Sequence, residues 1–303
     1  MMPAPPAHNP VMLREVAALL RPARARWIVD CTAGLGGHSE VLLTAAPPGA
    51  TLIAIDQDTE NLRHARHRIE PMAQSQDKHL RCFACNFARL NEVLAETQAP
   101  PVDALLADLG AASTQLDDAG RGFSFQLDGP LDMRMDRQGD EPTAADLVNG
   151  LGERELADLL YANADERKSR RIAAAIVRAR KAGRISRTRQ LAEIVSDALG
   201  GRRGRRIHPA TRTFQALRIA VNRELESLDS LLATLPDVLA PSGRAAVISF
   251  HSQEDRRVKR AFAAMKSAGA GRIVTPKPTM ADDEEIQANP RSRSAKLRCV
   301  ERA

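Results

Sequence analysis

Two carboxylates and a glycine-rich stretch form a candidate ligand site within the first sixty residues. The stretch is residues 30–39, DCTAGLGGHS, and Asp56 lies 22 positions after Gly34. Glycines let the backbone turn tightly and approach a ligand closely, because no Cβ stands in the way. A carboxylate at the end of the second strand of such a unit accepts both hydroxyls of a ribose. The spacing therefore predicts a nucleoside-binding site.

Two departures from the dinucleotide pattern indicate which nucleoside is bound. That pattern requires a third glycine three positions after Gly36, where this chain has Ser39. Asp30, at the entrance of the loop, would repel a pyrophosphate but suits a ligand that carries an amino group. S-adenosylmethionine has a ribose, an ammonium and a sulfonium and no phosphate, so these residues favour it over NAD. The competing interpretation, a glycine cluster that only forms a turn, is opposed by the flanking strands and by Asp56.

Further candidates for chemistry follow two later strands. Asp108 is the natural residue to face a transferred methyl group, because its carboxylate can accept the hydrogens of an aromatic amine and so sharpen a poor nucleophile. The alternative role for Asp108 is a helix N-cap. His251 is a candidate proton acceptor, with a structural histidine as the alternative. No metal is expected, because the C-x-x-C of Cys82 and Cys85 has no second pair at zinc spacing.

Alternating apolar strands and helices must position these residues. Such alternation predicts a mostly parallel α/β sheet, which binds ligands at the carboxyl ends of its strands. A single long helix is predicted over residues 211–235, ended by Pro236. The predicted strands are Trp27–Val29, Thr51–Ile55, Leu80–Phe83, Val102–Ala107, Arg244–Phe250 and Lys296–Val300.

Charge is concentrated in one region of the chain. The net charge is +6, but residues 165–206 alone carry +10, which leaves about −4 for the remainder. This asymmetry favours a polyanionic partner, most simply nucleic acid, over the alternative of a solvated helical surface. No apolar run is long enough to cross a membrane, and the N-terminus lacks the parts of a signal peptide, so a cytoplasmic enzyme is expected.

The candidate RNA contacts lie in loops and at one helix start. Phe123 and Phe125 lie on a loop beside arginines, where they can stack on a base or, equally, anchor a core. The basic candidates are Arg134, Arg202, Arg203, Arg205, Arg206, Arg212, Arg291 and Arg293. We assign residues 1–10 to a flexible tail, 11–112 and 209–303 to the α/β core, and 113–208 to an inserted basic helical domain for RNA recognition.

Several unusual runs together resemble one family. They include residues 8–13 (HNPVML), 121–125 (RGFSF), 129–136 (GPLDMRMD), 208–219 and 248–252 (ISFHS), besides the glycine loop. The resemblance covers residues 8–302 and is to the MraW family, the bacterial 16S rRNA (cytosine-N4) methyltransferases.

The resemblance implies a cytoplasmic, S-adenosylmethionine-dependent enzyme with a Rossmann-like class I methyltransferase core and a helical domain inserted after the fourth strand. Its substrate would be N4 of a cytidine in the decoding region of 16S rRNA, presented as free rRNA or as the small subunit, without an obligate protein partner. The cofactor residues that it implies are Gly36, Gly37, His38, Asp56, Phe87, Asp108 and Gln115. The alternatives are a methyltransferase acting on another nucleic acid, a non-catalytic ribosome-assembly factor that keeps a residual cofactor pocket, and an NAD-linked oxidoreductase.

Three positions depart from the family pattern. Ala111-Ala112-Ser113 replaces the usual Val-Ser-Ser and so lacks one hydroxyl near the expected target. Gln253 replaces a leucine, and Ala164-Asp165 stands where Gly-Glu is common. None of these changes touches the implied cofactor residues.

Overall fold

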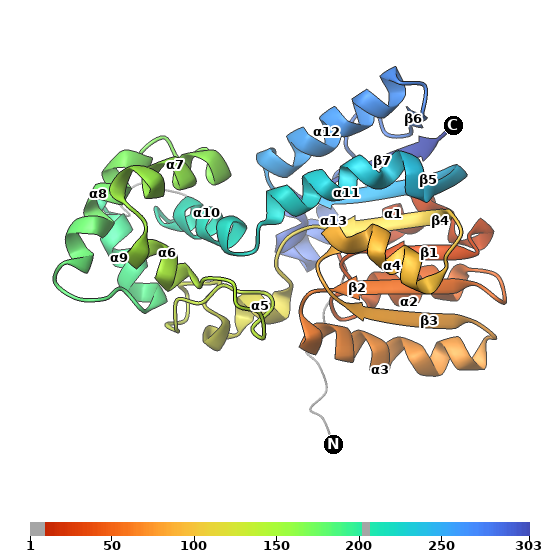
Figure 1. Cartoon of the computed structure of the whole chain (residues 1–303), viewed down its shortest axis with the longest axis horizontal. Helices are drawn as coiled ribbons and strands as arrows, with labels where there is room; N and C mark the ends of the chain where they lie inside the picture. The colour runs from red at the N-terminus through yellow and green to blue at the C-terminus, as the bar shows by residue number, and fades with distance from the viewer. Residues whose placement is uncertain (1–9, 202–206) are drawn as a thin grey trace. The chain divides into compact units, whose positions relative to one another are not determined.

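The apolar strands pair into one mostly parallel sheet (Figure 1). The computed structural model describes residues 10–201 and 207–303, and the sheet order there is β3-β2-β1-β4-β5-β7-β6. Strands β1 to β5 are parallel, and β7 runs antiparallel to β5 and β6. The strands are β1 (Trp27–Asp30), β2 (Thr51–Asp56), β3 (His79–Ala84), β4 (Val102–Asp108), β5 (Leu239–Ser249), β6 (Gly271–Ile273) and β7 (Lys296–Arg302). The predicted Rossmann-like core is confirmed.

The strand order reverses between β1 and β4, which is where such sheets bind ligands. In the register, Ile28 pairs with Leu52 of β2 and with Ala104 of β4. The carboxyl ends of β1, β2 and β4 therefore lie together at one edge of the sheet. These ends carry Asp30, Asp56 and Asp108.

Both faces of the sheet are buried, so the central strands are apolar throughout. Ile28 and Leu106 point to the face covered by α1 (Leu13–Leu20), α2 (Gly37–Ala45) and α3 (Thr59–Ser75). Val29 and Leu105 point to the face covered by α4 (Leu90–Thr97), α11 (Glu224–Val238) and α12 (Ser252–Ser267). The remaining elements of this part are η1 (Pro22–Arg24), η2 (Phe87–Arg89), α13 (Asp283–Ala288) and η4 (Pro290–Ser294).

A second compact unit, residues 111–225, is inserted between β4 and most of α11. Its elements are α5 (Ser113–Asp117), η3 (Ala119–Arg121), α6 (Ala144–Gly150), α7 (Glu153–Ala164), α8 (Ser169–Arg180), α9 (Thr188–Ala198) and α10 (Thr211–Val221). Its core is formed by apolar side chains of α6 to α10, among them Leu156, Ile172, Leu191 and Leu217. Residues 10–110 and 226–303 make up the first unit.

The predicted long helix over residues 211–235 is wrong. It is two helices, α10 and α11, because Arg223 adopts a left-handed conformation with φ of 49°. The same break moves the domain boundary: α10 packs into the core of the second unit through Phe214 and Leu217, so that unit ends near Leu225 instead of at residue 208.

None of the helices in residues 10–201 and 207–303 combines the length and the apolar run that crossing a bilayer requires.

Candidate functional site

The loop after β1 is braced by its own acidic residue. One carboxylate oxygen of Asp30 accepts from the Thr32 backbone N–H at 3.1 Å, and the other accepts from the Ser39 hydroxyl at 2.7 Å. Asp30 is fully buried, and this desolvation raises its pKa. Asp30 therefore fixes the loop from within and does not face a ligand, contrary to the sequence argument. Ser39, which replaces the third glycine, is its partner in this brace.

Two glycines of the loop are required by its close packing. Gly36 has φ of 82°, and a Cβ there would lie 3.0 Å from Cα of Ala65 and from Cδ1 of Ile69, both on α3. A Cβ on Gly37, the first residue of α2, would lie 2.3 Å from Cγ of Pro10. Any larger residue at either position would push the loop away from these neighbours.

Asp56 connects the end of β2 to the glycine loop. Its Oδ2 accepts from the Gly34 backbone N–H at 2.7 Å, and its Oδ1 accepts from the Asp58 N–H at 2.8 Å. Desolvation raises the pKa of Asp56 to about 7, and the hydrogen bonds from Asp58 and Gly34 oppose that shift. Asp56 is therefore a carboxyl group that titrates near neutral pH at the edge where ligands bind.

Buried His38 and partly exposed Asp108 form a polar pair beside this loop. The His38 Nε2 lies 3.6 Å from Oδ2 of Asp108, with side-chain exposures of 7% and 19%. Three buried atoms of this pair have no hydrogen-bond partner among the described residues: both ring nitrogens of His38 and Oδ1 of Asp108. A buried polar group without a partner costs about 1–3 kcal/mol, so such atoms point to a ligand that satisfies them.

A threonine that the sequence reasoning did not single out fixes Asp108. The Thr32 hydroxyl accepts from the Asp108 backbone N–H at 2.7 Å, which ties the end of β4 to the loop after β1. The two residues are 76 positions apart, so no local pattern indicates the contact.

The other predicted residues of the first unit have different surroundings. Phe87 begins η2 after β3 and packs against the core face that α4 covers. His251 caps α12: its Nδ1 accepts from the Glu254 N–H at 3.4 Å, and its Nε2 lies 3.1 Å from Oε1 of Glu254. The Nδ1 contact fits the structural alternative, whereas Nε2 is buried and makes no hydrogen bond within the described residues. The role of His251 as a proton acceptor therefore stays a prediction.

The C-x-x-C pair does not form a site in this fold. Cys82 packs against one face of the sheet and Cys85 against the other, and both thiols are free.

In the second unit, the two candidate phenylalanines are part of the packing. The ring of Phe125 lies 4.5 Å from the His208 ring and 4.8 Å from the Phe214 ring, between centroids. Phe123 is only 6% exposed. These contacts favour the core-anchor alternative for both residues over stacking on a base. Gln115 is buried, and its Oε1 accepts from the Ala112 N–H at 3.0 Å at the start of α5.

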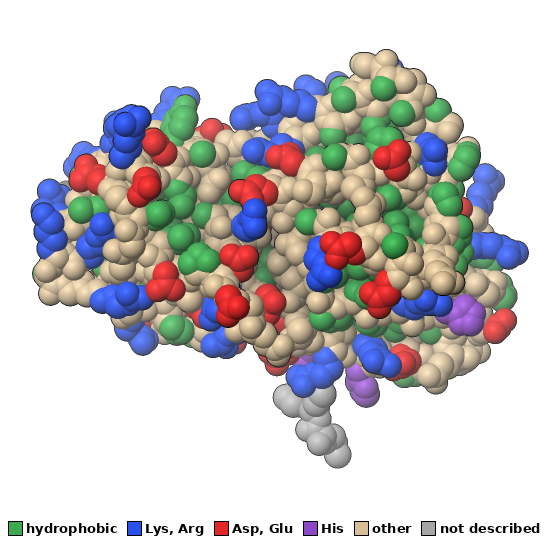
Figure 2. Space-filling view, viewed as in Figure 1, with side chains coloured by type: hydrophobic (Ala, Val, Ile, Leu, Met, Phe, Trp, Pro, Cys, Tyr) green, Lys and Arg blue, Asp and Glu red, His purple; other side chains and the backbone are tan. Residues whose placement is uncertain are grey.

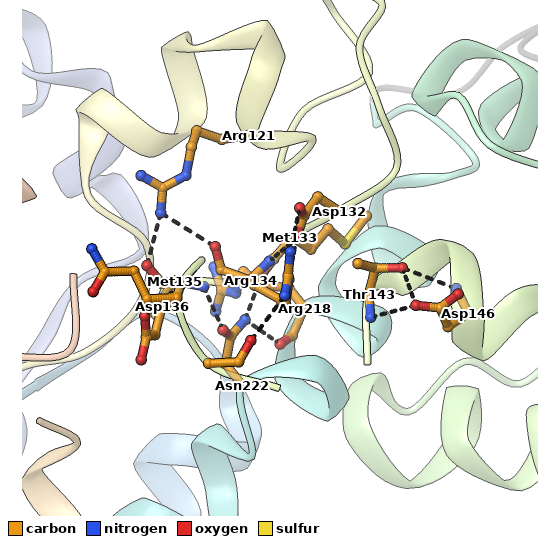
Figure 3. Close-up of polar contacts among 12 residues, drawn as sticks. Arg121, Asp132, Met133, Arg134, Met135, Asp136, Thr143, Asp146, Arg218 and Asn222 are labelled. Atoms are coloured by element: carbon orange, nitrogen blue, oxygen red, sulfur yellow. Dashed lines mark hydrogen bonds and ion pairs between the residues drawn. The ribbon is translucent and has the colours of Figure 1, made fainter. Parts of the chain in front are cut away.

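Side chains of other segments hold the segment around Arg134 in place by hydrogen bonds to its backbone (Figure 3). The Arg121 guanidinium donates to the carbonyl oxygens of Arg134 and Met135 at 3.2 and 2.9 Å. The Asn222 carboxamide accepts from the Met135 N–H and donates to the Met133 carbonyl, both at 2.8 Å. Arg134 itself pairs with Asp132 at 2.9 Å and is mostly buried, so its charge is already compensated within the unit.

The remaining arginine candidates are exposed where the structure describes them. Arg212 lies in the first turn of α10, and Arg291 and Arg293 lie on η4 of the first unit. The predicted contacts Arg202, Arg203, Arg205 and Arg206 fall outside the described residues.

Comparison with known proteins finds the same family that the sequence motifs resemble. Residues 6–303 match the model of the MraW methylase family. The ribosomal RNA small subunit methyltransferase H of Acidobacterium capsulatum is 46% identical over 296 residues, which cover 97% of this chain and 98% of the relative. The protein of the same name from Koribacter versatilis is 47% identical over 301 residues, covering 98% and 94%. Among solved structures, an rRNA methylase from Streptococcus thermophilus aligns with 96% of this chain and 93% of its own at 9% identity, with a TM-score of 0.44.

Proposed function

The chain belongs to the MraW methylase family, and from this premise we propose that it methylates the exocyclic N4 of a cytidine in the decoding region of 16S ribosomal RNA. The methyl donor is S-adenosylmethionine, the cosubstrate of this family of methyltransferases. The observation that carries the proposal is the His38–Asp108 pair. Its buried polar atoms without hydrogen-bond partners lie beside the glycine loop, where the strand order of the sheet reverses.

The residues at this edge fit S-adenosylmethionine. Asp56 has one backbone N–H on each carboxylate oxygen, so each oxygen keeps acceptor capacity for a ribose hydroxyl. Gly36 and Gly37 let the loop pack closely against α3 and Pro10, which fixes the loop whose Gly34 N–H donates to Asp56. His38 and Asp108 have polar atoms that a bound cofactor or substrate can satisfy. Phe87 is the further residue of the first unit that we propose for the cofactor, and Gln115 is proposed on the family resemblance alone.

The chain's own residues would then act by positioning and by accepting a proton. The cosubstrate supplies an electrophilic methyl carbon. The S–CH₃ bond breaks as the N–CH₃ bond forms, and N4 loses one proton. We assign Asp108 to accept a hydrogen of the cytidine amino group, which raises electron density on N4 in the transition state. His38, 3.6 Å away, orients that carboxylate.

The second unit is the proposed RNA-recognition domain. Its support is the surplus of basic residues, since a polyanion binds where positive charge is concentrated. Arg212, together with Arg291 and Arg293 of the first unit, remains a proposed phosphate contact. Free rRNA and the small ribosomal subunit are both candidate substrates, and an rRNA substrate places the enzyme in the cytoplasm.

One experiment tests the proposed activity. Small subunits from a strain that lacks the gene are incubated with the enzyme and S-adenosylmethionine, and the modified nucleotide is mapped by mass spectrometry. We expect N4 methylation of a single cytidine in 16S rRNA. Methylation of another nucleic acid, or none in an enzyme that binds subunits, would show that the substrate or the catalytic assignment is wrong.

The titration of Asp56 predicts a pH dependence of cofactor binding. Above about pH 7 the carboxylate is ionised and accepts from both ribose hydroxyls; below that pH it is protonated and loses acceptor strength. We therefore expect the affinity for S-adenosylmethionine to fall as the pH drops from about 8 to 6, approaching a tenfold loss per pH unit below the pKa.

Isothermal titration calorimetry measures this dependence directly. Near pH 7, proton release upon binding should appear as a heat that varies with the ionisation enthalpy of the buffer. The Asp56→Asn variant, which cannot titrate there, is the control and should show neither effect. A flat affinity across this range in the wild type would remove Asp56 from the cofactor site.

A further inference from the structure

The basic residues between positions 165 and 201 of the second unit divide into two groups by their contacts. Four arginines between residues 165 and 201 already have ion-pair or hydrogen-bond partners within the unit. Arg184 pairs with Asp146 and Arg187 with Asp128, both at 2.6 Å. Two others, Arg180 and Arg189, donate to backbone carbonyl oxygens. The charges or donors of these side chains are therefore largely satisfied within the unit.

Six further cations lack such partners. In the part of the chain that the structure describes, their side chains make no ion pair and no hydrogen bond, and all six are exposed. They lie on α8 or in the turns at its two ends. The six are Arg167, Lys168, Arg170, Arg171, Arg178 and Lys181. Lys and Arg side chains also gather at the edge formed by α8 and α9 in the space-filling view (Figure 2). The uncompensated charge of residues 165–201 is thus concentrated on α8 and the turns at its two ends.

A groove runs between α8 and α9 beside these cations. Its volume is about 410 Å³. Arg171 and Arg178 line it seven residues apart on one face of α8, which places them about 10 Å apart along the helix axis. Small side chains, among them Ala175 and Ala179 on the same helix, form its floor. We call this feature the α8/α9 groove.

The lining of the α8/α9 groove favours one kind of occupant. Two arginines without acidic partners attract phosphate, and the alanine floor lets a backbone approach the helix closely. No aromatic side chain lines the groove, so base stacking is not its contribution. Asp197, on the α9 side, is the single acidic residue of the lining and repels phosphate from that side.

We infer that the α8/α9 groove binds the sugar–phosphate backbone of the RNA substrate, with Arg171 and Arg178 each contacting a phosphate. This inference rests on the proposed function, because it takes RNA as the substrate. The contact is independent of base sequence, and it holds the RNA in register while other residues present the target cytidine.

The test is the salt dependence of RNA binding by the full chain. The probes are 16S rRNA and a single-stranded oligouridine. In the Arg171→Gln, Arg178→Gln double variant, we expect the slope of log affinity against log salt to decrease by about 1.4, about 0.7 for each phosphate contact. Affinity at low salt should drop roughly three- to tenfold for both probes alike.

Two further variants separate the groove from total charge. Arg14→Gln, Arg24→Gln removes the same charge from exposed side chains of the first unit that have no ion pair in the described structure, and should leave the slope nearly unchanged. Asp197→Asn removes the repulsive carboxylate and should strengthen binding about two- to threefold. A gain of affinity cannot come from damage to the fold.

The outcomes distinguish this inference from the proposed function. If the enzyme methylates rRNA but the arginine double variant keeps the wild-type slope, the groove assignment is wrong and the activity stands. If the slope changes as expected but no cytidine is methylated, the groove stands and the proposed activity is wrong. If the wild-type chain binds neither RNA probe, the groove assignment is wrong, and the subunit assay alone decides the proposed activity.

Discussion

Replacing Asp108 with asparagine should slow methyl transfer by about 10²–10⁴-fold, the usual contribution of a positioned proton acceptor. The change keeps the shape of the side chain and removes its charge, so the amino group of cytidine loses the acceptor for its hydrogen. The Asp108 backbone stays fixed, because the Thr32 hydroxyl accepts from its N–H and not from its side chain. Single-turnover rates at saturating S-adenosylmethionine and rRNA measure the effect apart from binding.

Asp108 is also proposed to contact the cofactor, so cofactor affinity must be measured separately. The loss in rate should exceed any loss in affinity by at least tenfold, as expected for an interaction made mainly in the transition state. A rate within threefold of the wild type would show that Asp108 does not take part in the chemistry.

A matched control is Asp255→Asn. Asp255 is similarly buried in the same unit, at 16% exposure, but it pairs with Arg298 at 2.6 Å and with Lys296 at 3.5 Å. Removing one partner of such a pair destabilises the fold. This variant should therefore unfold at a lower temperature and transfer methyl groups at the normal rate, which separates lost stability from lost chemistry.

The second large effect is on cofactor binding. Asp56→Ala removes two charge-assisted hydrogen bonds to the ribose, each contributing about 1.5–3 kcal/mol. The affinity for S-adenosylmethionine should therefore fall by about 10²–10⁴-fold. Equilibrium titration measures it, and an unchanged affinity would contradict the assignment.

Part of this loss can come from the glycine loop, because Asp56 also accepts from the Gly34 N–H. A cofactor analogue that lacks both ribose hydroxyls resolves the two contributions. It should bind the wild type more weakly than the natural cofactor does, and it should lose little further affinity in Asp56→Ala, since the missing pair is the same. Asp58→Ala is the control: it removes the N-cap of α3 and costs about 0.5–2 kcal/mol of stability without removing a ribose contact.

The sheet and the loop could be predicted because their signals are local. Apolar runs mark the strands, and each of the carboxylates Asp56 and Asp108 directly ends one, so parallel topology alone brings them to one edge. The role of Asp30 could not be predicted, because burial and the Ser39 hydroxyl decide it. An aspartate that faces a ligand and an aspartate that fixes the loop from within have the same local sequence pattern, so the sequence does not distinguish the two roles.

The second unit was harder to predict because its decisive contacts are between residues far apart in sequence. The break after α10 depends on Asn222, which bonds Met135, 87 positions away, and on a left-handed Arg223. Charge was countable from the sequence, but its distribution was not. Nothing local shows that Arg187 is neutralised by Asp128 while Arg171 has no such partner.

The insertion between β4 and β5 has a consequence for how the chain folds during synthesis. Leu105 pairs with Ala245, and everything between them must be made before the sheet can close. Residues 111–225, in contrast, are contiguous and have their own core, so this unit can fold as soon as it has left the ribosome. Once folded, it turns a long flexible connection into a short one and lowers the entropy lost when β5 joins β4. A destabilised second unit would therefore slow the folding of the catalytic sheet, even where every residue of that sheet is unchanged.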